Sequence, residues 1–125
     1  MKATREELKK LDRLKKRSDF LLVNANAANP GGKWVSKSMI VLAAPNGLDI
    51  KRVGFTATKK TDKSAVARNR MKRRLRAVAA DVLANNAKTG MDYVLLARQD
   101  TVTRPYEELT RDLLWCIRKM GHAVD

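Results

Sequence analysis

The segment over residues 64–86 constrains the fold most, because it combines the clearest helical period of the chain with its most basic stretch. Met71, Leu75, Val78 and Val82 recur at spacings of three and four. On a helix that turns by about 100° per residue, they form one narrow apolar stripe. We therefore predict a helix over residues 64–86 that packs this stripe against a sheet and carries its basic side chains on the other faces.

Residues 59–76, around the start of this helix, hold nine basic side chains and a single acid. Like charges this close destabilise an isolated helix by about 0.3 kcal/mol per pair. Arginine dominates the stretch, and its guanidinium binds phosphate through paired hydrogen bonds, while counterion release adds affinity. A polyanion-binding surface is therefore favoured over a merely solvated lysine-rich face. We expect the face opposite the stripe to present Asn69, Arg70, Lys72, Arg73 and Arg76, with Arg68 and Arg74 flanking the stripe.

The charge of the whole chain has the same polarity but an uneven distribution. The formal net charge is +14 over 125 residues; residues 1–76 hold 21 basic and 6 acidic side chains, and residues 77–125 hold 6 and 7. One part of the fold is thus expected to face a polyanion. The basic stretches lack a bulky apolar face, which argues against a membrane surface, and no apolar run approaches the about 20 residues that cross a bilayer.

Length and composition predict one domain over residues 1–125, in which residues 1–17 form a basic N-terminal arm that is mobile or ordered by its partner. Hydrophobic residues make up 44% of the chain, enough for a core. The first residues contain no apolar segment of the kind found in secretion signals, and the lone Cys116 cannot form an internal disulfide. We expect a cytoplasmic protein.

The order of elements predicts an α/β sandwich, a small sheet covered mainly by helices. The strand over 92–98 is almost continuously apolar, so we expect it in the interior of the sheet. The strands over 34–44 and 51–58 are separated by the turn Pro45-Asn46-Gly47, and we expect them to be antiparallel neighbours. The helices are predicted over residues 18–27, 64–86 and from Thr103 to Gly121.

Nothing in the sequence assembles a catalytic or metal site from protein side chains. His122 lies in a polar tail and is expected to be exposed, whereas Cys116 lies on the apolar stripe of the last helix and is expected in the core. Gly31-Gly32 lacks the lysine and flanking strand of a phosphate-binding loop. Acidic residues are sparse, and no cluster suggests a two-metal nuclease.

Four blocks in order resemble the bacterial ribonuclease P protein family. Residues 59–76, with Arg68-Asn69-Arg70 at their centre, closely resemble its "RNR" signature, and residues 13–23 its N-terminal motif. Residues 52–58 and 92–98 resemble the strands on either side of the signature. The resemblance implies an α-β-β-α-β-α fold with a left-handed βαβ crossover, ribosomal-S5-domain-2-like, against the general preference for right-handed crossovers.

The resemblance also implies a division of labour. The catalytic RNA subunit and its Mg²⁺ ions would cut the 5′ leader from precursor tRNA, with no cofactor or metal bound by the protein. The protein would bind two partners, that RNA and the leader, with no membrane or obligate protein partner. Carried over by position, the RNA-subunit contacts are Lys59, Lys60, Arg68, Asn69, Arg70, Lys72, Arg73 and Arg76. The leader contacts are Arg17, Phe20, Arg52, Thr56 and Thr58.

Some alternatives stay open on the residues alone. Phe20 is either a stacking platform for a leader base or a core aromatic that closes its helix onto the sheet. The charge pattern also suits a ribosomal or general structural RNA-binding protein. A DNA-binding regulator is disfavoured because no helix-turn-helix pair precedes the basic helix.

Overall fold

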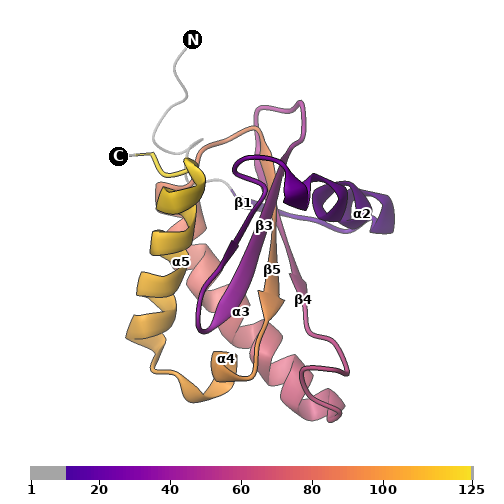
Figure 1. The fold of residues 1–125 in the computed structure, drawn as a ribbon, viewed down its shortest axis with the longest axis vertical. Coiled ribbons are helices and arrows are strands. Elements are labelled where there is room, and N and C mark those ends of the chain that lie inside the picture. Colours follow the sequence, from indigo (N-terminus) through magenta and orange to yellow (C-terminus); the bar gives the residue numbers. More distant parts are fainter. Residues whose placement is uncertain (1–10, 125) are drawn as a thin grey trace.

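The computed structural model describes residues 11–124 as a five-stranded sheet with helices on both faces (Figure 1). The strands lie in the order β1-β4-β5-β3-β2. They span β1 Leu11–Arg13, β2 Lys33–Val35, β3 Met39–Pro45, β4 Lys51–Thr56 and β5 Met91–Ala97. The helices are α2 Arg17–Ala25, α3 Ala65–Asn86, α4 Asp100–Thr103 and α5 Tyr106–Met120, with a 3-10 turn over Asn26–Ala28.

Strand β5 lies at the centre of the sheet, as its apolar composition predicted. It pairs antiparallel with β3 and parallel with β4. The prediction that the strands over 34–44 and 51–58 are neighbours was therefore wrong, because β5 lies between them. The physical reason is burial: β5 has apolar side chains on both faces, and only an interior position covers both.

The predicted strand over 34–44 is a hairpin instead. Its two arms, β2 and β3, turn back at Ser36-Lys37-Ser38, where the amide and hydroxyl of Ser36 both donate to the Met39 carbonyl, at 2.9 and 2.7 Å. The last predicted helix begins later than expected, and a separate short helix, α4, ends at Thr103. Arg104 is extended, as a residue before proline tends to be, so α5 begins only after Pro105.

The predicted N-terminal arm was too long. Leu11–Arg13 pair in parallel with β4 as the edge strand β1, and α2 begins at Arg17. Residues 1–10 lie outside the described residues.

The connection from β4 through α3 to the parallel strand β5 forms the predicted left-handed crossover. In Figure 1 both strands run downward, β5 lies to the left of β4, and α3 passes behind the sheet. Helices α3 and α5 cover this face with the larger core, which includes the stripe Met71, Leu75, Val78 and Val82. A smaller core, built on Val23, Leu42 and Val94, lies under α2 on the other face.

Lys51 is fully buried and terminates α3, an interaction that the sequence did not suggest. Its ammonium donates to the carbonyls of Leu83, Ala84 and Ala87 at 2.7, 2.8 and 2.9 Å. These belong to the last turn of α3 and the residue after it, where the helix dipole favours a cation. Burial lowers the pKa of Lys51 to about 8, so the charged form still predominates at neutral pH.

His122 is buried, contrary to the prediction of an exposed side chain. Its Nε2 lies 2.8 Å from the Gly31 carbonyl and donates to it, and its ring stands edge-on to Tyr93. Nδ1 has no hydrogen-bond partner among the described residues. The tail after α5 folds back on the body because the Val124 amide donates to Asn86 and the His122 carbonyl accepts from Lys88.

We expect acid to destabilise the protein through His122. Burial lowers its pKa below the ordinary value of 6.5, so below that pH the unfolded chain binds the proton more readily than the folded one. Stability is therefore full above pH 6.5 and falls as the pH drops further. His122→Gln, which can still donate to Gly31 but does not titrate, should lose less thermal stability than wild type between about pH 7.5 and about pH 5.5. Equal losses in the two proteins would contradict this assignment.

None of the described helices is long and apolar enough to span a membrane.

Candidate RNA interface

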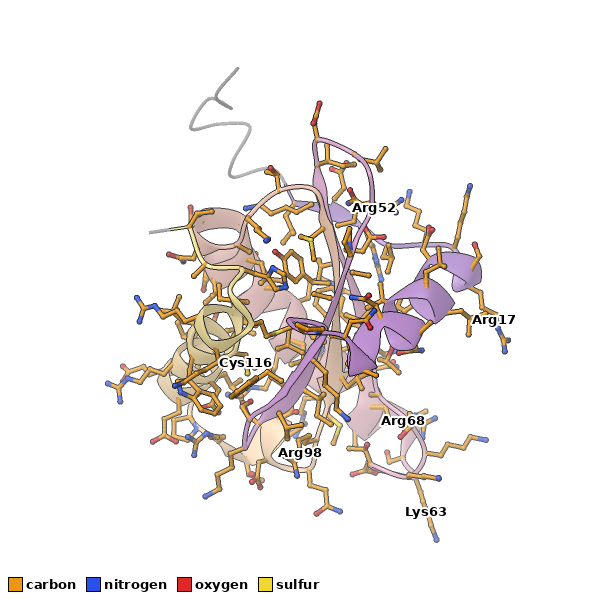
Figure 2. All side chains as sticks on the ribbon, turned by 45° about the horizontal axis from the view of Figure 1, so that its top comes forward. Arg17, Arg52, Lys63, Arg68, Arg98 and Cys116 are labelled. Carbon is orange, nitrogen blue, oxygen red and sulfur yellow. The ribbon has the colours of Figure 1, made fainter. Side chains whose placement is uncertain are left out.

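The basic surface begins in the loop that leads into α3. Ser64 caps the helix, its hydroxyl accepting a hydrogen bond from the Ala67 amide at 3.2 Å. Arg68 turns back on this loop and donates to the carbonyls of Asp62 and Lys63, both at 2.9 Å. Figure 2 shows Arg68 beside Lys63 at this end of the helix. Arg68 therefore orders the approach to α3 and is less open to a ligand than the sequence suggested.

The first half of α3 presents a row of exposed cations. Met71 and Leu75 are buried beneath it, as predicted, while Asn69, Arg70, Arg73 and Arg76 are exposed and Lys72 is half-buried. Within residues 11–124, none of these four cations forms an ion pair. The Arg76 guanidinium lies 5.7 Å from the centroid of the Phe55 ring, which holds it beside the sheet.

Three other cations of the signature stretch differ in how far they are open to a ligand. Lys59 and Lys60 are exposed in the loop after β4. Arg74, by contrast, reaches across to the end of α4 and donates to the carbonyls of Val102 and Arg104. Arg74 thus fixes α3 to that segment and leaves the outward surface to its neighbours.

A second candidate surface lies on the opposite face of the sheet, beside α2. The Phe20 ring rests on Gly54, where a Cβ atom would come within 2.4 Å of the ring atoms Cε1 and Cζ. Phe20 is half-buried and packs on the smaller core, so it closes α2 onto the sheet while keeping part of its ring open. Thr56 follows on the same strand face and is half-buried; Thr58 and Arg17 are exposed.

Arg52 lies on this face but is engaged by acids. Its Nε and Nη2 donate to Asp92 at 2.7 Å each, and its Nη1 lies 3.6 Å from Asp19 on α2. These contacts raise the pKa of Arg52, the hydrogen bond to Asp92 most. Asp92 also accepts from Asn46 at 3.0 Å. Arg52 therefore joins α2 to the two central strands, and offers a ligand only the part of its guanidinium that stays exposed.

The same face continues into an open pocket of about 380 Å³ that sequence reasoning missed. Lys37, Lys60, Thr61 and Arg98 line it, and Arg98 is held by a 2.7 Å hydrogen bond to the Ser36 carbonyl. The signal for Arg98 was present in the sequence, since it directly follows the central strand. Lys37 belongs to the turn of the unexpected hairpin and had no such signal.

The comparisons with known proteins give the family of the chain. A sequence model of the Ribonuclease P family matches residues 8–121. The chain belongs to the ribonuclease P protein family. A relative from Paramagnetospirillum magneticum, "Ribonuclease P protein component", is 45% identical over 117 residues, which cover 90% of this chain and 84% of the relative. Another of that name, from Caulobacter vibrioides, is 44% identical and covers 93% of this chain and 75% of its own.

Solved structures of ribonuclease P proteins share the fold. The Thermotoga maritima protein is 25% identical, with a TM-score of 0.70 over 86% of this chain and 96% of its own. The Staphylococcus aureus protein is 24% identical, with a TM-score of 0.68 over 87% and 94%. The α/β architecture expected from the sequence is confirmed.

Cys116 is buried in the core, as predicted, and burial raises the pKa of its thiol to about 11. Among residues 11–124, no three His, Cys, Asp or Glu side chains gather as a metal site.

A Gly54→Ala substitution should displace Phe20 and loosen α2. The added methyl would overlap the ring, and overpacking of this kind costs about 2 kcal/mol of unfolding free energy. We expect a matching drop in denaturant midpoint. Phe20→Ala removes the clashing ring, so in that background Gly54→Ala should cost much less, with only the 3.3 Å contact to the Leu14 Cβ left. Additive losses in the double variant would show that the ring does not rest on Gly54.

Proposed function

We propose that this chain is the protein subunit of a ribonuclease P ribonucleoprotein in the cytoplasm, where it promotes removal of the 5′ leader from precursor tRNA. It binds the catalytic RNA and the leader. The RNA subunit, with Mg²⁺ ions that it holds, supplies the chemistry. No membrane and no obligate protein partner take part.

The observation that carries the proposal is the row of exposed cations on α3. The exposed Arg70, Arg73 and Arg76 and the half-buried Lys72 lie away from the packed stripe of the helix, without ion pairs in the described structure. A folded protein keeps such repulsion when a polyanion neutralises it. We assign this row, with Asn69, Lys59 and Lys60, to the catalytic RNA. Arg68 supports it by ordering the preceding loop.

The face beside α2 suits an unpaired strand. Phe20 offers part of an aromatic ring on which a base can stack, while Thr56 and Thr58 offer hydroxyls and Arg17 a charge. Stacking is tolerant of sequence, as a subunit that handles many leaders requires. Arg52 acts here mainly by fixing α2 to the sheet, through Asp19 and Asp92.

The test is cleavage of a precursor tRNA by bacterial ribonuclease P RNA at low Mg²⁺, with and without this protein. We expect the protein to restore accurate 5′ cleavage and to be inert alone. If it binds the RNA tightly but leaves cleavage unchanged, it acts as a structural RNA-binding protein of the ribosomal type.

A further inference from the structure

Both tryptophans of the chain lie at the surface, in contact with each other. Trp34 on β2 and Trp115 on α5 are 36% and 44% exposed. Their ring centroids are 5.8 Å apart at an interplanar angle of 77°. Rings of this size are usually more buried, and neither belongs to the surfaces assigned above.

The pair lies at the edge of the sheet where its two faces meet. Trp34 is paired with Val41, whose side chain belongs to the core under α3 and α5, so Trp34 points to the α5 side. Its neighbours Lys33 and Val35 point to the other face, which carries α2. A single-stranded nucleic acid that crosses the β2 edge can therefore pass from the α2 face directly onto the two tryptophan rings.

The surroundings of the pair are positive. Arg111, Arg118 and Lys119 are exposed at positions four before, three after and four after Trp115, the spacings that share a helix face. Of the acids on this side of α5, Glu108 and Asp112 both pair with Arg104, at 2.9 and 2.8 Å. Glu107 lies one turn before Arg111, so the three exposed cations outnumber the remaining acid. Exposed indole rings among cations are typical of sites that bind single-stranded nucleic acid.

We infer that Trp34 and Trp115 bind unpaired bases of the precursor leader that lie beyond those held beside α2, with Arg111 and Lys119 on the phosphates. This inference rests on the proposed function. Stacking requires unpaired bases, and the leader is the unpaired strand of the proposed reaction. The surface assigned to the catalytic RNA starts at the far end of α3, on the opposite side from α5 in Figures 1 and 2. The second site extends the leader path around the β2 edge.

Tryptophan fluorescence reports on this site directly, because the chain has no other indole. We expect an unstructured oligoadenylate of about 10 nucleotides to quench the emission of the full chain, with a midpoint that rises with salt. Trp34→Phe and Trp115→Phe each keep one tryptophan, and the oligonucleotide should still quench the emission of that tryptophan. Oligonucleotide binding that leaves the emission unchanged would overturn the inference.

The decisive measurement is affinity of the holoenzyme for precursors with leaders of about 4 and about 16 nucleotides. Trp34→Ala/Trp115→Ala should weaken binding of the long-leader precursor at least about tenfold and leave the short-leader precursor unaffected. Arg111→Gln/Lys119→Gln, which leaves the core and the rings in place, should weaken binding of the long-leader precursor several-fold. Lys88→Gln, an exposed lysine after α3, is the control for charge alone.

If both variants bind the long-leader precursor as tightly as wild type does, the tryptophans are purely structural and the inference is overturned. Equal weakening of both precursors, with weaker binding of the catalytic RNA, would also overturn it and assign the pair to that RNA. If the proposed function itself is wrong, the result is different: adding wild-type protein would then raise the affinity for neither precursor.

Discussion

Replacing Arg70 and Arg73 together by alanine is expected to lower affinity for the catalytic RNA about 100-fold at low salt. Each exposed guanidinium is assigned one phosphate contact, and each lost contact removes one released counterion. A plot of log affinity against log salt concentration should flatten by about one unit for Arg70→Ala and about two for the pair. Filter binding of the catalytic RNA alone, across a salt series, measures both quantities.

The matched control is Lys88→Ala, which removes one exposed positive charge beyond the other end of the same helix. It should change the salt slope little. If Lys88→Ala flattens the slope as much as Arg70→Ala does, the RNA responds to net charge and the row on α3 is not the contact surface.

A second comparison is Arg68→Ala. Because Arg68 holds two loop carbonyls, its loss should also disorder the start of α3, seen as faster amide exchange there.

Lys51→Met is expected to lower the free energy of unfolding by about 3 kcal/mol. Methionine fills a similar volume but leaves the carbonyls of Ala84 and Ala87 without the charged donor that satisfies them. The penalty of unpaired groups in a buried site exceeds the gain from burying a thioether. In a domain of this size, the melting temperature should fall by about 10 °C. Calorimetry and urea unfolding measure the effect.

Lys88→Met makes the same substitution at an exposed position and should shift the melting temperature by only a degree or two. Folded Lys51→Met protein should still bind the catalytic RNA at low temperature. Lys51 is buried on β4 and contacts the C-terminal end of α3, whereas Arg70 lies near the start of that helix. A Lys51→Met protein as stable as wild type would mean that the last turn of α3 needs no donor. If the folded Lys51→Met protein binds the RNA more weakly than wild type does, Lys51 is part of the interface.

The long elements could be predicted from the sequence because their signals are local. Helix α3 follows from the three-and-four spacing of Met71, Leu75, Val78 and Val82. The central place of β5 follows from its continuous apolar run. The outward cations of α3 follow from the same stripe, since a buried face determines the opposite one.

The partners of particular side chains were not predictable in this way. Arg52 seemed free for a ligand, yet it pairs with Asp92, forty residues later, because β4 and β5 become neighbours only in the folded sheet. His122 seemed exposed, yet the tail folds back so that it reaches Gly31. Arg68 and Arg74 look like their neighbours in the sequence, and only their carbonyl partners distinguish them.

Consecutive residues suffice to show that this protein has one basic helix with a packed side and an open side, because charge and helical period are local properties. Which cations stay available to a ligand depends on the tertiary fold. That fold also brought Trp34 and Trp115 together from positions 81 residues apart, at the edge of a hairpin that the sequence did not reveal. These contacts depend on the order of the strands in the sheet and on the folding back of the tail, and both are set by which distant segments bury one another.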